Sequence, residues 1–154
     1  MTYTEYRNFR QGGFDALPIF WAFSPGQFRE AMERRGLTEN DTDKIYSLGM
    51  GGYALKSDRE AIDAFLNAPD PLPDLMRDSA FAEEAFYYEM CNHEYGINSQ
   101  GDWDVCSCFG DCQYSPEKGG KEYLLDMGYG DTAIGAYLRA RRRYYRAAEE
   151  NEWF

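Results

Sequence analysis

Residues 45–55 read IYSLGMGGYAL, and this stretch decides the fold class. Two short runs rich in apolar and aromatic residues, 45–48 and 53–55, flank four residues of which three are glycine. This pattern predicts two antiparallel strands joined by a tight turn, because glycine supplies the positive φ angles that hairpin turns require. A phosphate-binding loop is the alternative, but its last glycine would be followed directly by Lys-Ser or Lys-Thr and then by a helix. Neither follows here, so we predict a β-hairpin.

A third strand and a helix are predicted ahead of the hairpin. Residues 18–23 read PIFWAF, and aromatic and β-branched residues in such a run favour a buried strand. Ser24 stands three residues before Gln27, as in a capping box, and Pro25 suits the first helical position, where no backbone N–H is needed. Gly36 provides a typical end for this helix.

C-terminal to the hairpin, the sequence pattern predicts helices only. Residues 57–60 read SDRE, a second capping box, and the helix that they open is ended by the prolines within 69–73. A longer helix is predicted over about 74–93, where apolar residues recur at steps of three and four. Residues 95–120 show no regular pattern, apart from a helix start near residue 115.

Two last helices complete the pattern, one from Ser115-Pro116 to Leu125 and one that begins at Asp131. The order of strand, helix, two strands and then helices predicts the α+β class, with a small antiparallel sheet of about three strands packed against four to five helices. At 154 residues, without repeats or a convincing linker, the chain fits a single domain that spans residues 1–154.

Composition argues against disorder, membrane insertion and secretion. Hydrophobic residues make up 44% of the chain and aromatic residues 17%, which is too much for a disordered segment. No window approaches the roughly 18 apolar residues that a membrane span needs. The first residues lack the basic start and apolar run of a secretory signal. We therefore expect a cytoplasmic protein with reduced cysteines.

The net charge of −11 is concentrated in the middle of the chain. Residues 58–111 hold 13 acidic and two basic residues, whereas the remainder is balanced. Such a field repels nucleic acid and favours partners with a basic surface. A solvated face that keeps the protein soluble is the alternative. Near the C-terminus, five arginines lie within residues 139–146, and docking onto the acidic middle is at least as plausible for them as phosphate binding.

The sharpest chemical signal is a group of four cysteines and the single histidine within 22 residues. Zinc takes Cys and His ligands in a tetrahedral shell, so zinc is the one cofactor that this composition allows. The spacing differs from the paired Cys-x2-Cys knuckles of structural zinc sites, and small buried core residues are the alternative. The candidate ligands are Cys91, His93, Cys106, Cys108 and Cys112.

Catalysis is less favoured by the same residues. A nucleophilic cysteine needs a thiolate, and the acidic residues Glu94, Asp102, Asp104 and Asp111 around these cysteines raise a thiol pKa. His93 and Glu94 could form a general acid/base pair, but adjacent helical residues point about 100° apart.

Residues 20–110 resemble a family of small uncharacterised proteins found in phages, prophages and gut bacterial genomes. The resemblance rests on the strand-to-helix stretch 20–28, the turn 49–53 and, above all, residues 88–95, which contain Asn92-His93-Glu94-Tyr95. The family has no established activity to carry over. It implies that a shared functional site would include residues 92–95, unless these form a structural helix terminus. Relatives tend to have Leu and Ala at 106 and 108, which argues against a zinc site common to the family.

Charge and resemblance together predict a non-enzymatic binding or inhibitor protein of a phage or mobile element. Its partner would be a basic, nucleic-acid-binding surface of a bacterial host protein, such as a defence nuclease, by analogy with anti-CRISPR proteins. A zinc-stabilised structural or interaction module is the alternative, and an enzyme that uses His93 and Glu94 is a third. Oligomeric state is not indicated. The predicted contact residues are Asp74, Asp78, Glu83, Glu84, Glu89, Asn92, His93, Glu94 and Tyr95.

Overall fold

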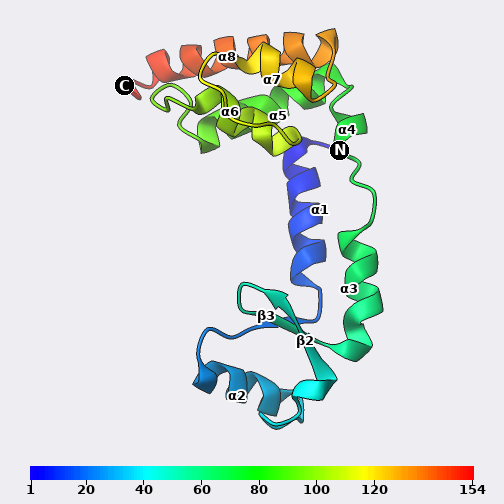
Figure 1. The fold of residues 1–154 in the computed structure, drawn as a ribbon. Coiled ribbons are helices and arrows are strands. Elements are labelled where there is room, and N and C mark those ends of the chain that lie inside the picture. Colours follow the sequence, from blue (N-terminus) through cyan, green and yellow to red (C-terminus); the bar gives the residue numbers. More distant parts are fainter. The chain divides into compact units, whose positions relative to one another are not determined.

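A computed structural model describes residues 1–154, and the chain divides into two compact units. The sheet unit comprises Asn8–Pro69, and the helical unit comprises Met1–Arg7 together with Asp70–Phe154. Helix α1 (Tyr3–Asp15) begins in the helical unit and ends in the sheet unit (Figure 1). The expectation of one domain over the whole chain stays a prediction, and each unit is described by itself.

The sheet unit confirms the predicted hairpin and the α+β class. Strands β2 (Ile45–Gly49) and β3 (Gly52–Leu55) pair antiparallel, and β1 (Ile19–Trp21) pairs antiparallel with the other side of β3, which gives the order β1-β3-β2. At the turn, Gly49 and Gly51 adopt φ angles of 86° and 85°. Glycine tolerates these angles because it lacks a Cβ, so the glycine pattern of the turn has a direct steric cause.

Two helices accompany this sheet. In α2 (Pro25–Arg34), Ser24 Oγ accepts a hydrogen bond from Gln27 N at 3.2 Å, as the capping pattern predicted. The core of the unit contains Phe20, Ala31, Met32 and Ile45, and Phe28 packs edge-on against Tyr53. Helix α3 (Arg59–Leu66) follows a 3-10 turn at Lys56–Asp58 and has no side-chain cap, so the predicted capping box at residues 57–60 is absent.

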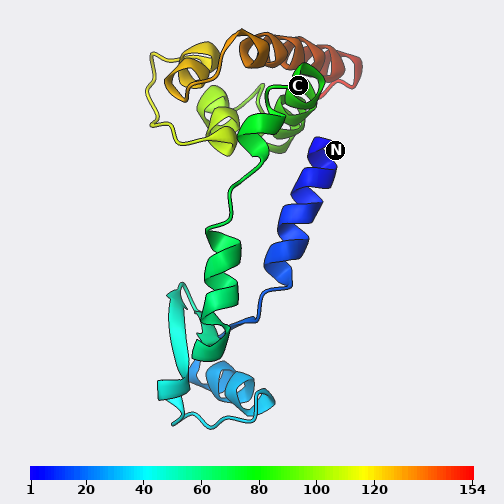
Figure 2. The same ribbon diagram turned by 90° about the vertical axis from the view of Figure 1, so that its right-hand side faces the viewer.

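The helical unit contains α4 (Leu72–Leu75), α5 (Ser79–Asn92), α6 (Gly101–Cys106), α7 (Gly120–Asp126) and α8 (Asp131–Glu150). Helices α5 and α8 lie side by side in both views (Figures 1 and 2). Small residues line their contact and allow close approach: Ala82, Ala85, Ala136 and Ala140 are all fully buried. Phe86, Met90, Tyr123 and Tyr137 are among the larger side chains of this core.

The structure has eight α-helices, where the sequence predicted four to five. The predicted helix over 74–93 is two helices, because Asp78 has an extended backbone and its Oδ1 accepts a hydrogen bond from Phe81 N at 2.8 Å. Asp78 therefore starts α5 as its N-cap. Helices α1 and α6 were not predicted, and the glycine pair Gly12-Gly13 explains the weak helix signal of α1. None of the helices has the length and apolar character that a membrane crossing requires.

Candidate functional site

The last turn of α5 brings Glu89 and His93 onto one helix face, because residues four apart are neighbours on an α-helix. Cys108 approaches them from the 3-10 turn Ser107–Phe109 that follows α6. One ligand atom of each residue lies within 4.8 Å of the other two. His93 Nε2 is 3.3 Å from Glu89 Oε2 and 3.5 Å from Cys108 Sγ. We call these three residues the Glu-His-Cys cluster.

Glu89 is buried, and both oxygens of its carboxylate have polar partners within the chain. Glu89 is only 4% exposed. Tyr3 donates a hydrogen bond from its hydroxyl to Oε1 at 2.7 Å, and Arg7 Nη1 lies 3.5 Å from the same oxygen. Asn92 Nδ2 donates to Oε2 at 3.2 Å. Because an uncompensated buried charge is strongly unfavourable, these partners fix the carboxylate with Oε2 toward His93 and Cys108.

The arrangement does not suit a nucleophilic cysteine. Burial, and then the nearby Glu89 carboxylate, raise the pKa of the Cys108 thiol to about 12, so the thiol stays protonated at neutral pH. Moreover, Glu89 and Cys108 both face the same ring nitrogen of His93. A catalytic triad uses one imidazole nitrogen for the nucleophile and the other for the acid.

Three donor atoms that converge on one point are what a metal ion requires. Zinc–ligand distances of about 2.0–2.3 Å in a tetrahedral shell place the ligand atoms roughly 3.3–3.8 Å from one another. The separations from His93 Nε2, 3.3 Å and 3.5 Å, fall in this range. A charge-assisted N–H···O bond between His93 and Glu89 would be shorter, about 2.7–2.9 Å, whereas 3.5 Å is also a hydrogen-bond distance to the sulfur of Cys108. The side chains present therefore fit zinc, with three protein ligands.

The cluster includes two of the five residues predicted as metal ligands, His93 and Cys108, and Glu89 from the predicted acidic contacts. The other cysteines lie outside it. Cys91 is exposed, Cys106 is fully buried with its Sγ 3.8 Å from Gly120 O, and Cys112 is half-buried. The signal that sequence reasoning missed is the four-residue spacing of Glu89 and His93 on a helix.

The segment Asn92-His93-Glu94-Tyr95 forms the C-terminal cap of α5. Glu94 has a φ of 50°, Tyr95 N donates to Met90 O at 3.0 Å, and Glu94 N donates to Cys91 O at 3.4 Å. These bonds define a Schellman motif, in which a left-handed residue ends the helix. Tyr95 is buried, and its hydroxyl donates to Asp102 Oδ1 at 2.6 Å. This segment therefore ends helix α5, and it also directs the side chain of His93 into the Glu-His-Cys cluster.

The predicted acidic contacts of α5 have partners within the chain. Glu83 Oε2 accepts a hydrogen bond from Arg139 Nε at 2.8 Å, and Glu84 Oε1 accepts one from Arg143 Nη1 at 2.8 Å. This confirms, for two of its arginines, that the basic helix α8 docks on the acidic middle of the chain. Asp78 is used as the helix cap, whereas Asp74 is largely exposed and lies 3.6 Å from Arg77.

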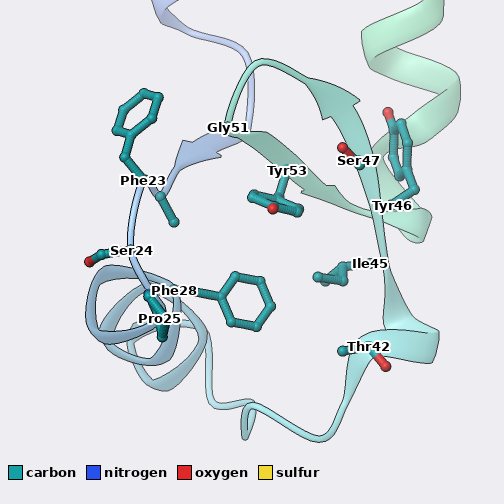
Figure 3. A pocket seen from close by; sticks show the side chains of 11 residues that line it. Phe23, Ser24, Pro25, Phe28, Thr42, Ile45, Tyr46, Ser47, Gly51 and Tyr53 are labelled. Carbon is teal, nitrogen blue, oxygen red and sulfur yellow. The ribbon is translucent and has the colours of Figure 1, made fainter.

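The sheet unit contains an open, largely apolar groove of about 820 Å³ between the start of α2 and the sheet. Figure 3 shows Phe28, Ile45 and Tyr53 directed into it, with Ser24 and Pro25 on the α2 side. Phe23 stands at its rim, 74% exposed, and its ring lies against Gly51, where a Cβ would be 2.5 Å from a ring carbon. No carboxylate, imidazole or thiol lines the groove, and its titratable side chains are the phenols of Tyr46 and Tyr53.

The profile of a family of unknown function, DUF7659, matches residues 2–110. The matched region covers well over half of the chain and includes all three residues of the Glu-His-Cys cluster. No curated protein and no solved structure is significantly similar to the chain.

Proposed function

We propose that this chain, which belongs to the family of unknown function DUF7659, is a zinc-binding module that holds the ion through Glu89, His93 and Cys108. The convergence of their ligand atoms on one point, at separations of 3.3 Å and 3.5 Å from His93 Nε2, carries this proposal. Sulfur and imidazole ligands favour zinc over magnesium or calcium, which prefer oxygen.

The ion would tie together segments that are distant in sequence. Glu89 and His93 belong to the last turns of α5, and Cys108 belongs to the turn after α6. Because the ligands are brought together only in the folded state, the free energy of zinc binding adds to the free energy of folding. A cysteine at 108 departs from the resemblance noted above, so we propose the metal for this chain and not for its whole family.

The surrounding residues have defined tasks in such a site. Tyr3 and Arg7 hold Oε1 of Glu89, which leaves Oε2 for the ion. In the metal-free protein, the thiol of Cys108 donates a hydrogen bond to the backbone oxygen of Asp104, with a distance of 3.4 Å between Sγ and O. Zinc binds the thiolate, so binding would release that proton, and affinity would increase with pH.

Elemental analysis of the full chain, purified without a histidine tag under reducing conditions, tests the proposal. We expect about one zinc per chain, a higher Tm with zinc than after chelation, and loss of the metal in His93→Gln and Cys108→Ser. Cys91→Ser is the matched control and should retain the metal, because Cys91 is exposed and outside the cluster. Absence of zinc from the wild type, or its retention by Cys108→Ser, would contradict the proposal.

A second proposal is that the helical unit binds a basic surface of a host protein. It is supported by charge, since this unit contains 18 acidic and 9 basic residues and so carries most of the excess of the chain. Asp74, with its side chain 83% exposed, is the best placed of the predicted contacts, because Glu83 and Glu84 are paired with α8. Capture of a partner from bacterial lysate should then weaken steeply with salt and with Asp74→Lys. Capture that is insensitive to both would contradict it.

A further inference from the structure

One arginine of α8 lines a pocket and forms no salt bridge. Arg139 and Arg143 pair with α5, but Arg141 makes no salt bridge. It lines a pocket of about 250 Å³ within the helical unit, between the loop after α5, α6, the loop before α7, and α8. We call this the polar pocket. Its second cation, Lys118, already donates to Asp126 Oδ2 at 2.6 Å, so Arg141 is the cation of the pocket that forms no salt bridge.

The polar pocket also contains a fixed carboxylate with a free oxygen. Asp102 Oδ1 accepts hydrogen bonds from the hydroxyls of Tyr95, at 2.6 Å, and of Tyr137. Both tyrosines are buried, so they hold the carboxylate in one orientation. Oδ2 accepts no hydrogen bond, although a carboxylate oxygen has two lone pairs. The pocket therefore presents one guanidinium without a salt bridge and one carboxylate oxygen without a hydrogen bond from the protein.

Aromatic residues are among the side chains that line the pocket, whose surface is mostly polar. Trp103 and Tyr114 pack edge-on with ring centres 5.9 Å apart, and Trp103 Nε1 donates to Cys112 O at 2.9 Å, which fixes the indole. The guanidinium of Arg141 lies 5.5 Å from the centre of the Tyr145 ring.

We propose that the polar pocket binds a free amino acid in its zwitterionic form. The carboxylate of the ligand would pair with Arg141, and its ammonium group would donate to Asp102 Oδ2. At about 250 Å³ the pocket is below the usual range of roughly 300–1,000 Å³ for larger ligands. Its volume therefore suits a ligand as small as an amino acid. A net neutral ligand also avoids repulsion by the −11 charge of the chain, which opposes binding of free phosphate.

Thermal stability of the full chain, measured with each of the twenty amino acids at about tenfold-spaced concentrations up to the millimolar range, tests the proposal. We expect at least one to raise the Tm, whereas acetate and methylammonium, which carry one charge each, should not. Arg141→Gln should weaken the binding at least about tenfold, because it removes a charged hydrogen bond. Arg142→Gln, which makes the same charge change one residue away, is the matched control.

Asp102→Asn provides a second variant, because its amide oxygen still accepts from the two tyrosines while the negative charge is lost. It should also weaken binding of the amino acid. The proposal is overturned if none of the twenty raises the Tm of the wild type, or if Arg141→Gln binds as tightly as the wild type. A stabilisation by inorganic phosphate alone that Arg141→Gln removes would assign an oxyanion site and overturn the zwitterion. These outcomes are independent of the zinc content of the protein.

Discussion

Glu89 is buried in the core of the helical unit as a carboxylate, and its environment explains why a charge is kept there. Tyr3, Arg7, Asn92 and His93 all contact its two oxygens. A methionine or leucine at position 89 would fill the same space and would need no hydrogen-bonding partners there. Replacement of buried ionic groups by apolar residues is often neutral or stabilising, so stability alone is a weak reason for the carboxylate. A ligand role for Oε2 gives the position a chemical reason.

At the same scale, Cys108 predicts how the metal-free protein responds to alkali. Its pKa is raised from the ordinary 9.0 to about 12 in the folded state, so the unfolded chain loses this proton first as pH rises. Stability from the neutral thiol is complete below about pH 9 and declines toward pH 12. Chemical unfolding of the chelated protein at pH 8, 9, 10 and 11 should show this decline. Cys108→Ser, which does not titrate, should show a smaller decline, and equal slopes would contradict the assignment.

Glu94 gives a second prediction at the residue scale. Its φ of 50° lies in the left-handed region, where a side chain is strained and glycine is not. Glu94→Gly should therefore raise the free energy of unfolding by about 0.5–1 kcal/mol. Glu94→Ala, which keeps a Cβ at the same φ, is the control and should give no such gain. Urea unfolding of the three proteins measures the difference, and a loss of stability in Glu94→Gly would show that the carboxylate itself matters.

At the scale of the element, the same residue type has opposite effects in the hairpin and in α2. Gly51 has a φ of 85°, and a Cβ there would be 2.5 Å from the Phe23 ring, whereas Gly26 in α2 has nothing within 4 Å of an added Cβ. Gly51→Ala should lower the free energy of unfolding by more than about 1 kcal/mol, and Gly26→Ala should raise it by up to about 1 kcal/mol. Unfolding curves of both variants check the signs. An unchanged stability in Gly51→Ala would mean that the turn and the Phe23 ring rearrange freely.

The pairing of α5 with α8 predicts a modest electrostatic coupling. Arg139 and Glu83 have side chains that are 41% and 29% exposed, so solvent screens much of their attraction. A double-mutant cycle with Glu83→Gln and Arg139→Gln should give a coupling of about 0.2–1 kcal/mol, smaller in high salt. The same cycle on Glu83 and Arg142, which form no salt bridge, is the control and should give no coupling. The buried alanines between the helices should contribute more to stability than this pair.

At the scale of the whole molecule, local patterns predicted the elements better than the site. Glycines at 49 and 51, the Ser24 cap and the periodicity of α8 depend on neighbours in sequence, and each gave the right element. The Glu-His-Cys cluster depends on a contact between Cys108 and a helix that ends 16 residues earlier, which no spacing rule encodes. The zinc prediction therefore named the histidine and one of the cysteines that the structure brings together in this cluster, but not the carboxylate. The apolar groove gave no sequence signal, since its lining comes from six separate short runs of residues.

The two units have separate buried cores, and this predicts how the molecule opens. Met32 is fully buried in the core of the sheet unit, and Met90 is fully buried in that of the helical unit. A buried Met→Ala change costs about 2–5 kcal/mol through lost contacts and a cavity. If the units open independently, Met32→Ala should accelerate backbone hydrogen exchange within residues 8–69 only, and Met90→Ala within residues 1–7 and 70–154 only. Acceleration across the whole chain in both variants would instead show one cooperative domain. Zinc should then slow exchange throughout, and not in the helical unit alone.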